Sequence, residues 1–169
     1  LLRSHRRGVM PRVAANIRYF AGYAEHELQH PDMEIRGHRQ RITYDPSGVT
    51  AIITPWNAPL MLATWRIGPA LASGNCVVAK PPEWAPLTAS LFADITHQAG
   101  LPPGVFNVVQ GTGIEAGAPL SAHPGIDRLS FTGSVPTAGE VSKSAAPNIV
   151  PLSFELGGKS PLLVMDDAD

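Results

Sequence analysis

Residues 48–80 read GVTAIITPWNAPLMLATWRIGPALASGNCVVAK, and this stretch decides the fold class. Two short apolar runs, 49–54 and 76–80, are each followed by proline and predict buried strands. Between them, 60–71 predicts an apolar helix that ends at Ser73-Gly74-Asn75. A strand, a helix and a second strand in this order are typical of a parallel sheet, because a helix returns the chain between neighbouring strands.

The same alternation continues toward the C-terminal end. Further helices are expected at 87–99, 113–122 and 135–145, and further strands at 105–109, 126–131, 149–154 and 161–165. Strands and helices that alternate about every ten to fifteen residues predict an α/β fold, a Rossmann-like parallel sheet with helices on both faces.

The residues before this unit predict a helix and a strand. Apolar side chains spaced three and four apart make one helical stripe over 11–30, and Pro31 ends it because its ring disfavours helix at His30. In the polar stretch 38–46, Ile42 and Tyr44 alternate with polar residues, which predicts an edge or bridging strand.

Composition narrows the class of protein. The chain has 169 residues, of which 44% are hydrophobic and 16% charged, as expected for a globular domain. The formal net charge of -1 argues against a nucleic-acid partner, and no apolar run is long enough to span a membrane. The single cysteine, Cys76, excludes an internal disulfide and favours a cytoplasmic location; within its apolar strand it is expected to pack as a small hydrophobic residue.

Polar and glycine residues follow the predicted strands. They fall in five short segments, 55–57, 80–83, 110–113, 132–134 and 155–158. In open parallel sheets ligands bind at the carboxyl ends of the strands. We therefore expect the tips of successive strands to converge on one site.

Two of these segments suggest nucleotide chemistry. Gly133-Ser134 follows a strand and opens a helix, where backbone N–H groups and the helix dipole favour the binding of a phosphate. The G-x-G-x-x-G fingerprint of dinucleotide sites does not occur here, so the alternative is that Ser134 only caps the helix. Lys80 and Glu83 can hold a ribose diol, one by donating and the other by accepting a hydrogen bond. Glu83 would also repel a 2′-phosphate, which favours NAD over NADP. The alternative is that Lys80 and Glu83 form only an ion pair on the protein surface.

Two other strand ends carry candidate catalytic groups. The side-chain amide of Asn57 could stabilise an oxyanion, although an asparagine near proline also commonly forms a turn. Glu155 ends an apolar strand, where burial would raise its proton affinity and suit it to act as a general base. Gly157 and Gly158 after it allow a close approach of backbone to a ligand.

The segment His26-Glu27-Leu28-Gln29-His30 matches the H-E-x-x-H zinc motif, which puts both imidazoles on one face of a helix. The proline that follows disturbs the helix at the second histidine, and Met33 and Arg36 stand where the longer zinc-protease motif has glycine and histidine. Glu34 and Asp45 remain possible third ligands. A zinc hydrolase is therefore a remote alternative, and we predict no metal site.

Six stretches taken in order resemble the aldehyde dehydrogenase family. They are IITPWNAP at 52–59, GPALASGN at 68–75, KPPE at 80–83, GLPPGV at 100–105, FTGS at 131–134 and FELGGKSP at 154–161. The resemblance covers the chain from about Arg18 to Asp169. It implies an oxidoreductase that converts a small-molecule aldehyde to a carboxylic acid with NAD. In this family a cysteine thiolate attacks the aldehyde, the thiohemiacetal transfers hydride to the nicotinamide, and water then cleaves the thioester.

The resemblance implies roles for the residues at the strand ends. Asn57 would donate its amide to the oxyanion, and Glu155 would activate water. Lys80 and Glu83 would hold the adenosine ribose, and Ser134 would meet the pyrophosphate. The further cofactor contacts implied in the same way are Ile53, Thr54, Pro55, Trp56, Gly111, Phe131, Thr132, Gly133, Thr137 and Leu156.

The resemblance also implies what lies outside this chain. The family's nucleophilic cysteine follows the Glu-Leu-Gly-Gly segment, beyond Asp169, and Cys76 cannot stand in for it. We therefore expect an inactive fragment of a homo-oligomeric enzyme, or alternatively a truncated nucleotide-binding module without catalysis. The parts would be an N-terminal helical segment at 1–36, an NAD-binding domain at 37–156 and the beginning of a catalytic domain at 157–169.

Three positions refine the comparison with the family. Ala138 stands where many members have glycine, which affects the geometry expected around the pyrophosphate. Trp84 and Phe154 are similar to those of the hydroxymuconic semialdehyde dehydrogenase branch, a weak indication of the aldehyde.

Overall fold

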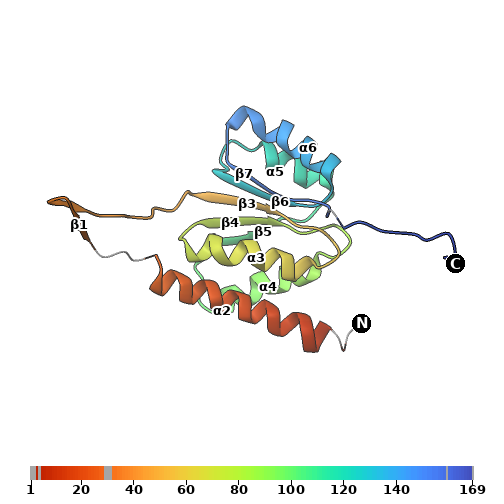
Figure 1. Cartoon of the computed structure of the whole chain (residues 1–169), viewed down its shortest axis with the longest axis horizontal. Coiled ribbons are helices and arrows are strands. Elements are labelled where there is room, and N and C mark those ends of the chain that lie inside the picture. The colour runs from red at the N-terminus through yellow and green to blue at the C-terminus, as the bar shows by residue number, and fades with distance from the viewer. Residues whose placement is uncertain (1–2, 4, 29–31, 159, 169) are drawn as a thin grey trace.

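The computed structural model describes residues 3, 5–28, 32–158 and 160–168. Figure 1 shows two helical layers around a central sheet. The helices and helical turns are η1 His5–Val9, α2 Met10–His26, α3 Pro59–Ala72, α4 Leu87–Gln98, η2 Gly113–Gly117, α5 Ala118–Ala122, α6 Val135–Ala145 and η3 Ala146–Asn148. The strands are β1 Met33–Ile35, β2 His38–Gln40, β3 Val49–Ile53, β4 Cys76–Lys80, β5 Phe106–Val108, β6 Arg128–Thr132 and β7 Leu152–Glu155.

Five of the strands form one parallel sheet in the order β5-β4-β3-β6-β7. From β3 the chain builds outward through β4 to β5, returns to the other side of β3 as β6, and then adds β7. The strand order therefore reverses between β3 and β6, which is where open α/β sheets hold their ligands. The predicted fold class, a Rossmann-like parallel sheet with helices on both faces, is confirmed.

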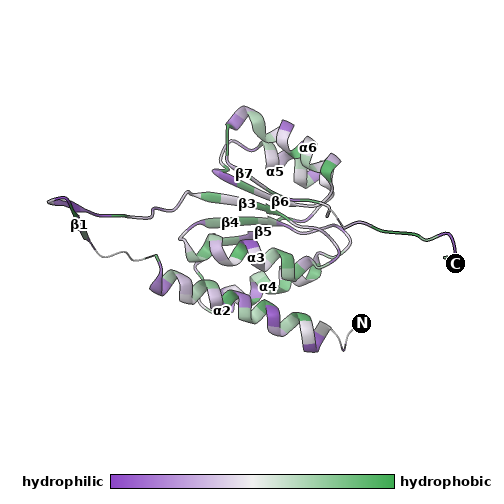
Figure 2. Cartoon of the chain, viewed as in Figure 1, coloured by the Kyte–Doolittle hydropathy of each residue, from purple (hydrophilic) through white to green (hydrophobic). Residues whose placement is uncertain are grey.

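The helices divide between the two faces of the sheet. α5 and α6 lie on one face, α3 and α4 lie on the other, and α2 packs against the outer side of α3 (Figure 1). Side chains of β3 alternate between these layers: Ala51 and Ile53 join the apolar cluster under α6, and Ile52 joins the cluster under α3. Figure 2 shows hydrophobic residues along β3 and β4, between the two helical layers.

α2 is held close to α3 at a glycine. A Cβ added at Gly68 would lie 2.8 Å from the ring of Phe20, so a larger residue would push the two helices apart. The helix predicted over 11–30 is confirmed as far as His26, whereas His30 and Pro31 lie outside the described residues. In the part of the chain that is described, no helix has the length and apolar character needed to cross a membrane.

The strand predicted at 161–165 is wrong. These residues have no regular structure, and the tail runs away from the sheet (Figure 1). Their apolar side chains, Leu162 and Leu163 among them, are exposed. A strand needs a neighbour with backbone groups to pair, and within the described residues β7 pairs with β6 alone.

Two other predicted strands each lose three residues or more, whereas the ends of the rest differ by at most two residues. In 149–154, Ile149 adopts a left-handed φ of 52° and closes η3, so β7 begins only at Leu152. In 38–46, only β2 is a strand, and it pairs antiparallel with β1 in a hairpin that projects from the body (Figure 1). The predictions are wrong for the remaining residues of both stretches, Ile42 and Tyr44 included.

An ion cluster holds the base of the β1–β2 hairpin. Asp32 accepts hydrogen bonds from Arg41 Nε at 2.7 Å and from Arg39 Nε at 2.6 Å. These two guanidinium groups, Arg41 first and then Arg39, lower the pKa of the Asp32 carboxyl below its ordinary value.

Candidate functional site

The carboxyl ends of β3, β4 and β6 lie level with one another. Ile53 is in register with Lys80 on one side and with Phe131 on the other. These three residues and Thr137 of α6 line a cavity of about 530 Å³ between the sheet, η2, α5 and α6. Four of the predicted cofactor contacts therefore share one cavity, beside the point where the strand order reverses.

Lys80 and Glu83 form a pair at the end of β4. The Lys80 side chain is only 4% exposed, and its Nζ lies 3.2 Å from Glu83 Oε2. The backbone N–H of Glu83 itself, and then Lys80, hold the pKa of the Glu83 carboxyl below its ordinary value. Because Lys80 is buried against the cavity, the alternative of an ordinary surface ion pair does not describe it.

Ser134 caps α6. Its Oγ accepts a hydrogen bond from the Thr137 backbone N–H at 3.3 Å and lies 2.8 Å from Thr137 Oγ1. The helix-cap alternative is therefore confirmed. A cap does not exclude an anion at the same place, because the helix dipole still makes this end of α6 electropositive.

Two predicted glycines are explained by packing. A Cβ at Gly133 would lie 2.5 Å from the Phe131 ring, and at Gly111, where φ is 142°, it would lie 2.9 Å from Ala116 Cβ. Gly133 also donates its backbone N–H to the Glu155 carbonyl oxygen at 3.1 Å. Contact of these glycines with a cofactor stays a prediction.

Asn57 is exposed in the turn between β3 and α3. Its Oδ1 accepts a hydrogen bond from the Ala58 backbone N–H at 3.1 Å, as expected for a turn-forming asparagine. This bond uses the carbonyl oxygen. The amide nitrogen, which would donate to an oxyanion, takes no part in it.

Glu155 ends β7 on the face of the sheet that α3 covers. Its side chain is 64% exposed, and Oε1 lies 2.8 Å from Nη2 of Arg66. Both residues line a cavity of about 240 Å³ with Thr132. The prediction that burial activates this carboxylate is wrong for this chain, because the group is solvated and ion-paired; its role as a base stays a prediction.

The remaining predicted residues lie at the same edge. Thr54 is buried and donates its backbone N–H to the Lys80 carbonyl oxygen at 3.3 Å. The rings of Trp56 and Trp84 are 6.4 Å apart, and both are exposed. Pro55, Thr132 and Leu156 follow or end β3, β6 and β7.

Comparison with known proteins decides the family. The model of the "Aldehyde dehydrogenase family" matches residues 2–169. The chain belongs to the aldehyde dehydrogenase family. It is 45% identical over 161 residues to a chloroplastic betaine aldehyde dehydrogenase of Beta vulgaris, covering 93% of this chain and 32% of that protein. It is 43% identical to the 2-aminomuconic semialdehyde dehydrogenase of Mus musculus, covering 95% of this chain and 33% of the relative.

A solved structure of the same family also matches. Aldehyde dehydrogenase C of Pseudomonas syringae, a C291A mutant in complex with NAD+ and octanal, is 44% identical with a TM-score of 0.83. The match covers 98% of this chain and 33% of that structure. The chain thus spans about a third of the length of the aldehyde dehydrogenases it matches.

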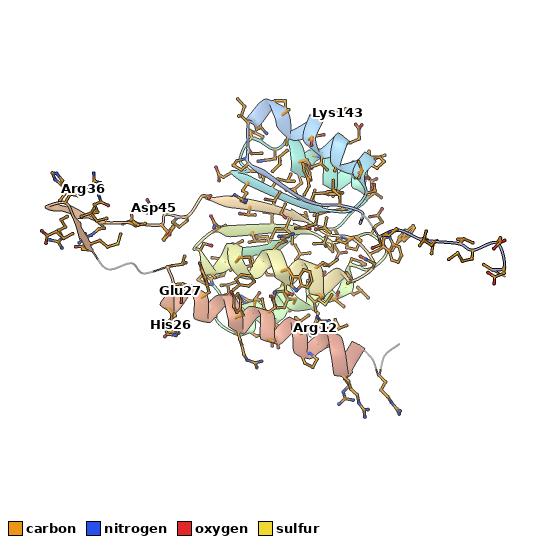
Figure 3. All side chains as sticks on the ribbon, viewed as in Figure 1. Arg12, His26, Glu27, Arg36, Asp45 and Lys143 are labelled. Atoms are coloured by element: carbon orange, nitrogen blue, oxygen red, sulfur yellow. The ribbon has the colours of Figure 1, made fainter. Side chains whose placement is uncertain are left out.

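The zinc motif finds no support in the described residues of this aldehyde dehydrogenase chain. His26 and Glu27 lie where α2 ends, and Asp45 lies apart from them on the segment that leads into β3 (Figure 3). His30 lies outside the described residues. Across the residues that the structure describes, no group of three or more His, Cys, Asp or Glu side chains is placed to hold a metal.

Cys76 lies at the wrong end of its strand to act at the site. It begins β4, whereas Lys80 ends it, and its backbone N–H donates to Gly48 at 3.0 Å. The thiol is free and half-buried, in keeping with the predicted packing role. In this aldehyde dehydrogenase chain the single cysteine therefore lies at the opposite end of β4 from the carboxyl-terminal edge.

Sequence reasoning missed most of the cavity wall. The additional lining residues are Gly113, Ile114, Gly117, Ala118, Ser121, Pro136, Glu140, Val141 and Ser144. Those of α6 recur at helical spacing on the same side as Thr137, a signal that could have found them. Of those in η2 and α5, only Gly113 belongs to a predicted strand-end segment, 110–113, and the others gave no such signal.

Proposed function

We propose that this chain is the cofactor-binding part of an NAD-dependent aldehyde dehydrogenase that oxidises an aldehyde to a carboxylic acid. The observation that carries the proposal is Lys80, buried beside the cavity at the strand-order reversal and paired with Glu83. A cation and a carboxylate at this place suit the two hydroxyls of a ribose. The cavity of about 530 Å³ is of the size that ligand sites have.

The preference for NAD over NADP rests on Glu83. The lowered pKa keeps its carboxyl ionised at neutral pH. An ionised carboxylate beside the ribose accepts a hydrogen bond from a 2′-hydroxyl and repels a 2′-phosphate.

Asn57 and Glu155 would serve the reaction. When bound, NAD supplies the hydride acceptor. The Asn57 amide would donate to the oxyanion formed from the aldehyde. The Glu155 carboxylate, now paired with Arg66, would take a proton from water. Since Cys76 lies at the far end of β4, we propose that a cysteine outside this chain is the nucleophile.

The setting of the complete enzyme belongs to the same proposal. We propose a small-molecule aldehyde substrate, a homo-oligomer and a cytoplasmic location, the last supported by the single free cysteine. Of the two aromatic residues that suggested a semialdehyde, Phe154 packs on Phe131 in the core, and only Trp84 is exposed at the site's edge. The particular aldehyde stays a prediction.

Titration calorimetry with NAD tests the cofactor proposal. We expect saturable binding of one equivalent, reduced about tenfold or more when Lys80→Ala and Glu83→Ala are combined. Arg12→Ala is the control, because Arg12 is exposed on α2 and is not among the residues that line the cavity. Absence of NAD binding, or equal losses in both variants, would contradict the proposal.

An assay of NADH formation tests the catalytic roles proposed for this chain. With NAD and an aldehyde, we expect the chain alone to form no NADH, because Cys76 cannot reach the site. Turnover that persists in Cys76→Ala would show that the catalytic roles proposed for this chain are wrong.

A further inference from the structure

The two faces of β6 and β7 differ sharply in polarity. On the α6 face, these strands carry Leu129, Phe131, Leu152 and Phe154, which belong to or pack on the apolar core. On the α3 face, the alternate positions of the same strands are all polar: Arg128, Ser130, Thr132, Ser153 and Glu155. Both faces of a parallel sheet are usually apolar and covered. The polar face therefore calls for an explanation other than core packing.

A second cavity lies on this polar face. It has a volume of about 390 Å³ and lies on the opposite side of the sheet from the proposed NAD cavity. The register places its strand residues side by side, with Thr50 opposite Arg128 and Ser130 opposite Ser153. The full lining is Leu28, Tyr44, Asp45, Ser47, Thr50, Arg66, Pro69, Ala70, Ser73, Asn75, Arg128, Ser130 and Ser153.

Ser130 supplies an unused hydrogen-bonding group in the wall of this cavity. The residue is only 6% exposed, and its Oγ has no hydrogen-bond partner among the described residues. A buried hydroxyl without a partner is costly and rare in folded proteins. A ligand in the cavity would give this hydroxyl a partner.

The charges of the lining favour an anion. Arg66 and Arg128 are its two cations, and Asp45 is the one carboxylate among the lining residues. Arg66 is already paired with Glu155. Arg128 donates to Ser153 Oγ at 3.0 Å, a neutral partner that leaves its charge unbalanced.

We propose that this cavity, lined by Arg128, Ser130 and Ser153, binds a small oxyanion, a carboxylate or a phosphate. The planar guanidinium of Arg128 would donate two hydrogen bonds to the oxyanion, and the Ser130 hydroxyl would donate a third. The site is separate from the proposed cofactor cavity, and it stands whether or not NAD binds the other face.

NMR titration of the isotope-labelled chain with inorganic phosphate tests the site, because amide shifts show where the ion binds. We expect saturable shifts at Thr50, Arg128, Ser130 and Ser153. Shifts confined to the first turn of α6 would assign phosphate to the proposed pyrophosphate position and overturn this inference. A parallel titration with acetate identifies the preferred oxyanion: the tighter ion defines the class, and saturable binding of either supports the site.

Variants connect the shifts to the named groups. We expect Arg128→Gln to weaken binding about tenfold and Ser130→Ala to weaken it about threefold or more. Arg12→Gln is the control, because Arg12 is exposed on α2 and is not among the lining residues; its phosphate binding should stay within about twofold of the parent chain. Equal losses in Arg128→Gln and Arg12→Gln, with no loss in Ser130→Ala, would show only general ionic attraction and would overturn the proposal.

Melting temperatures measured without phosphate show whether a variant that binds poorly is still folded. Ser130→Ala removes an unpartnered hydroxyl, so its melting temperature without phosphate should equal or exceed that of the parent chain. A folded Ser130→Ala chain that binds phosphate as tightly as the parent chain would contradict the role of this hydroxyl. If Arg128→Gln fails to fold, Arg128→Lys, which keeps the charge and loses the planar fork, replaces it and should still weaken binding.

Discussion

At the scale of single residues, the proposed preference for NAD over NADP rests on Glu83. Its lowered pKa means that the carboxylate persists well into mildly acidic solution. Because Glu83 stays ionised between about pH 5 and 8, we expect the preference for NAD over NADP to weaken only toward the acidic end, where the 2′-phosphate of NADP, with a second pKa of about 6, gains a proton. Glu83→Gln removes the charge but keeps a hydrogen-bond acceptor, and it should reduce the preference about tenfold. Calorimetric titration of both dinucleotides at several pH values measures this ratio.

The same scale shows what sequence could and could not predict at the site. Lys80 and Glu83 were predictable because they are three residues apart and directly follow an apolar run. The Arg66–Glu155 ion pair was not, because these residues are far apart in the sequence and meet only in the folded chain, across a small cavity between α3 and the end of β7. The exposure of Glu155 was missed for the same reason: local apolarity of a strand says nothing about what covers its end.

At the scale of elements, Ser134 stabilises the start of α6. Its side chain satisfies the Thr137 backbone N–H, so Ser134→Ala should lower the free energy of unfolding by about 1 kcal/mol. Ser142→Ala, within the same helix, is the control and should be neutral or slightly stabilising, because alanine is the better helix former. Urea denaturation followed by circular dichroism measures both. Equal effects of the two substitutions would show that the cap contributes nothing.

The β1–β2 hairpin should respond to pH through Asp32. Arg41 and Arg39 lower the pKa of the Asp32 carboxyl in the folded chain. The ion cluster therefore stabilises the hairpin fully above the pKa of the unfolded chain, near 3.8, and this stabilisation is lost as pH falls through the lower pKa of the folded chain. We expect the protection factors of the hairpin amides, which compare observed with intrinsic exchange rates, to fall as the solution is acidified below about pH 4. Asp32→Asn should exchange faster at neutral pH and lose this dependence. An unchanged pH profile in the variant would contradict the role of the cluster.

At the scale of the whole molecule, the sequence predicted the class of fold but not every strand. Alternation of apolar runs and helical stripes is local, and it correctly indicated a parallel sheet with helices on both faces. Pairing is not local. The run at 161–165 has the composition of a strand, yet it remains unpaired because no neighbour beyond β7 is present in the described part of the chain. Its side chains are therefore left in solvent.

This exposed tail should make the chain self-associate. Leu162, Leu163, Val164 and Met165 are each at least 67% exposed and contiguous, and such apolar patches promote association. Removing residues 161–169 should keep the chain monomeric to a higher concentration, as measured by size-exclusion chromatography with light scattering. The melting temperature should change little, because the tail runs away from the sheet (Figure 1). If the shortened chain associates as strongly as before, the prediction is wrong, and the association would be assigned to the exposed leucines of α4, Leu87 and Leu91.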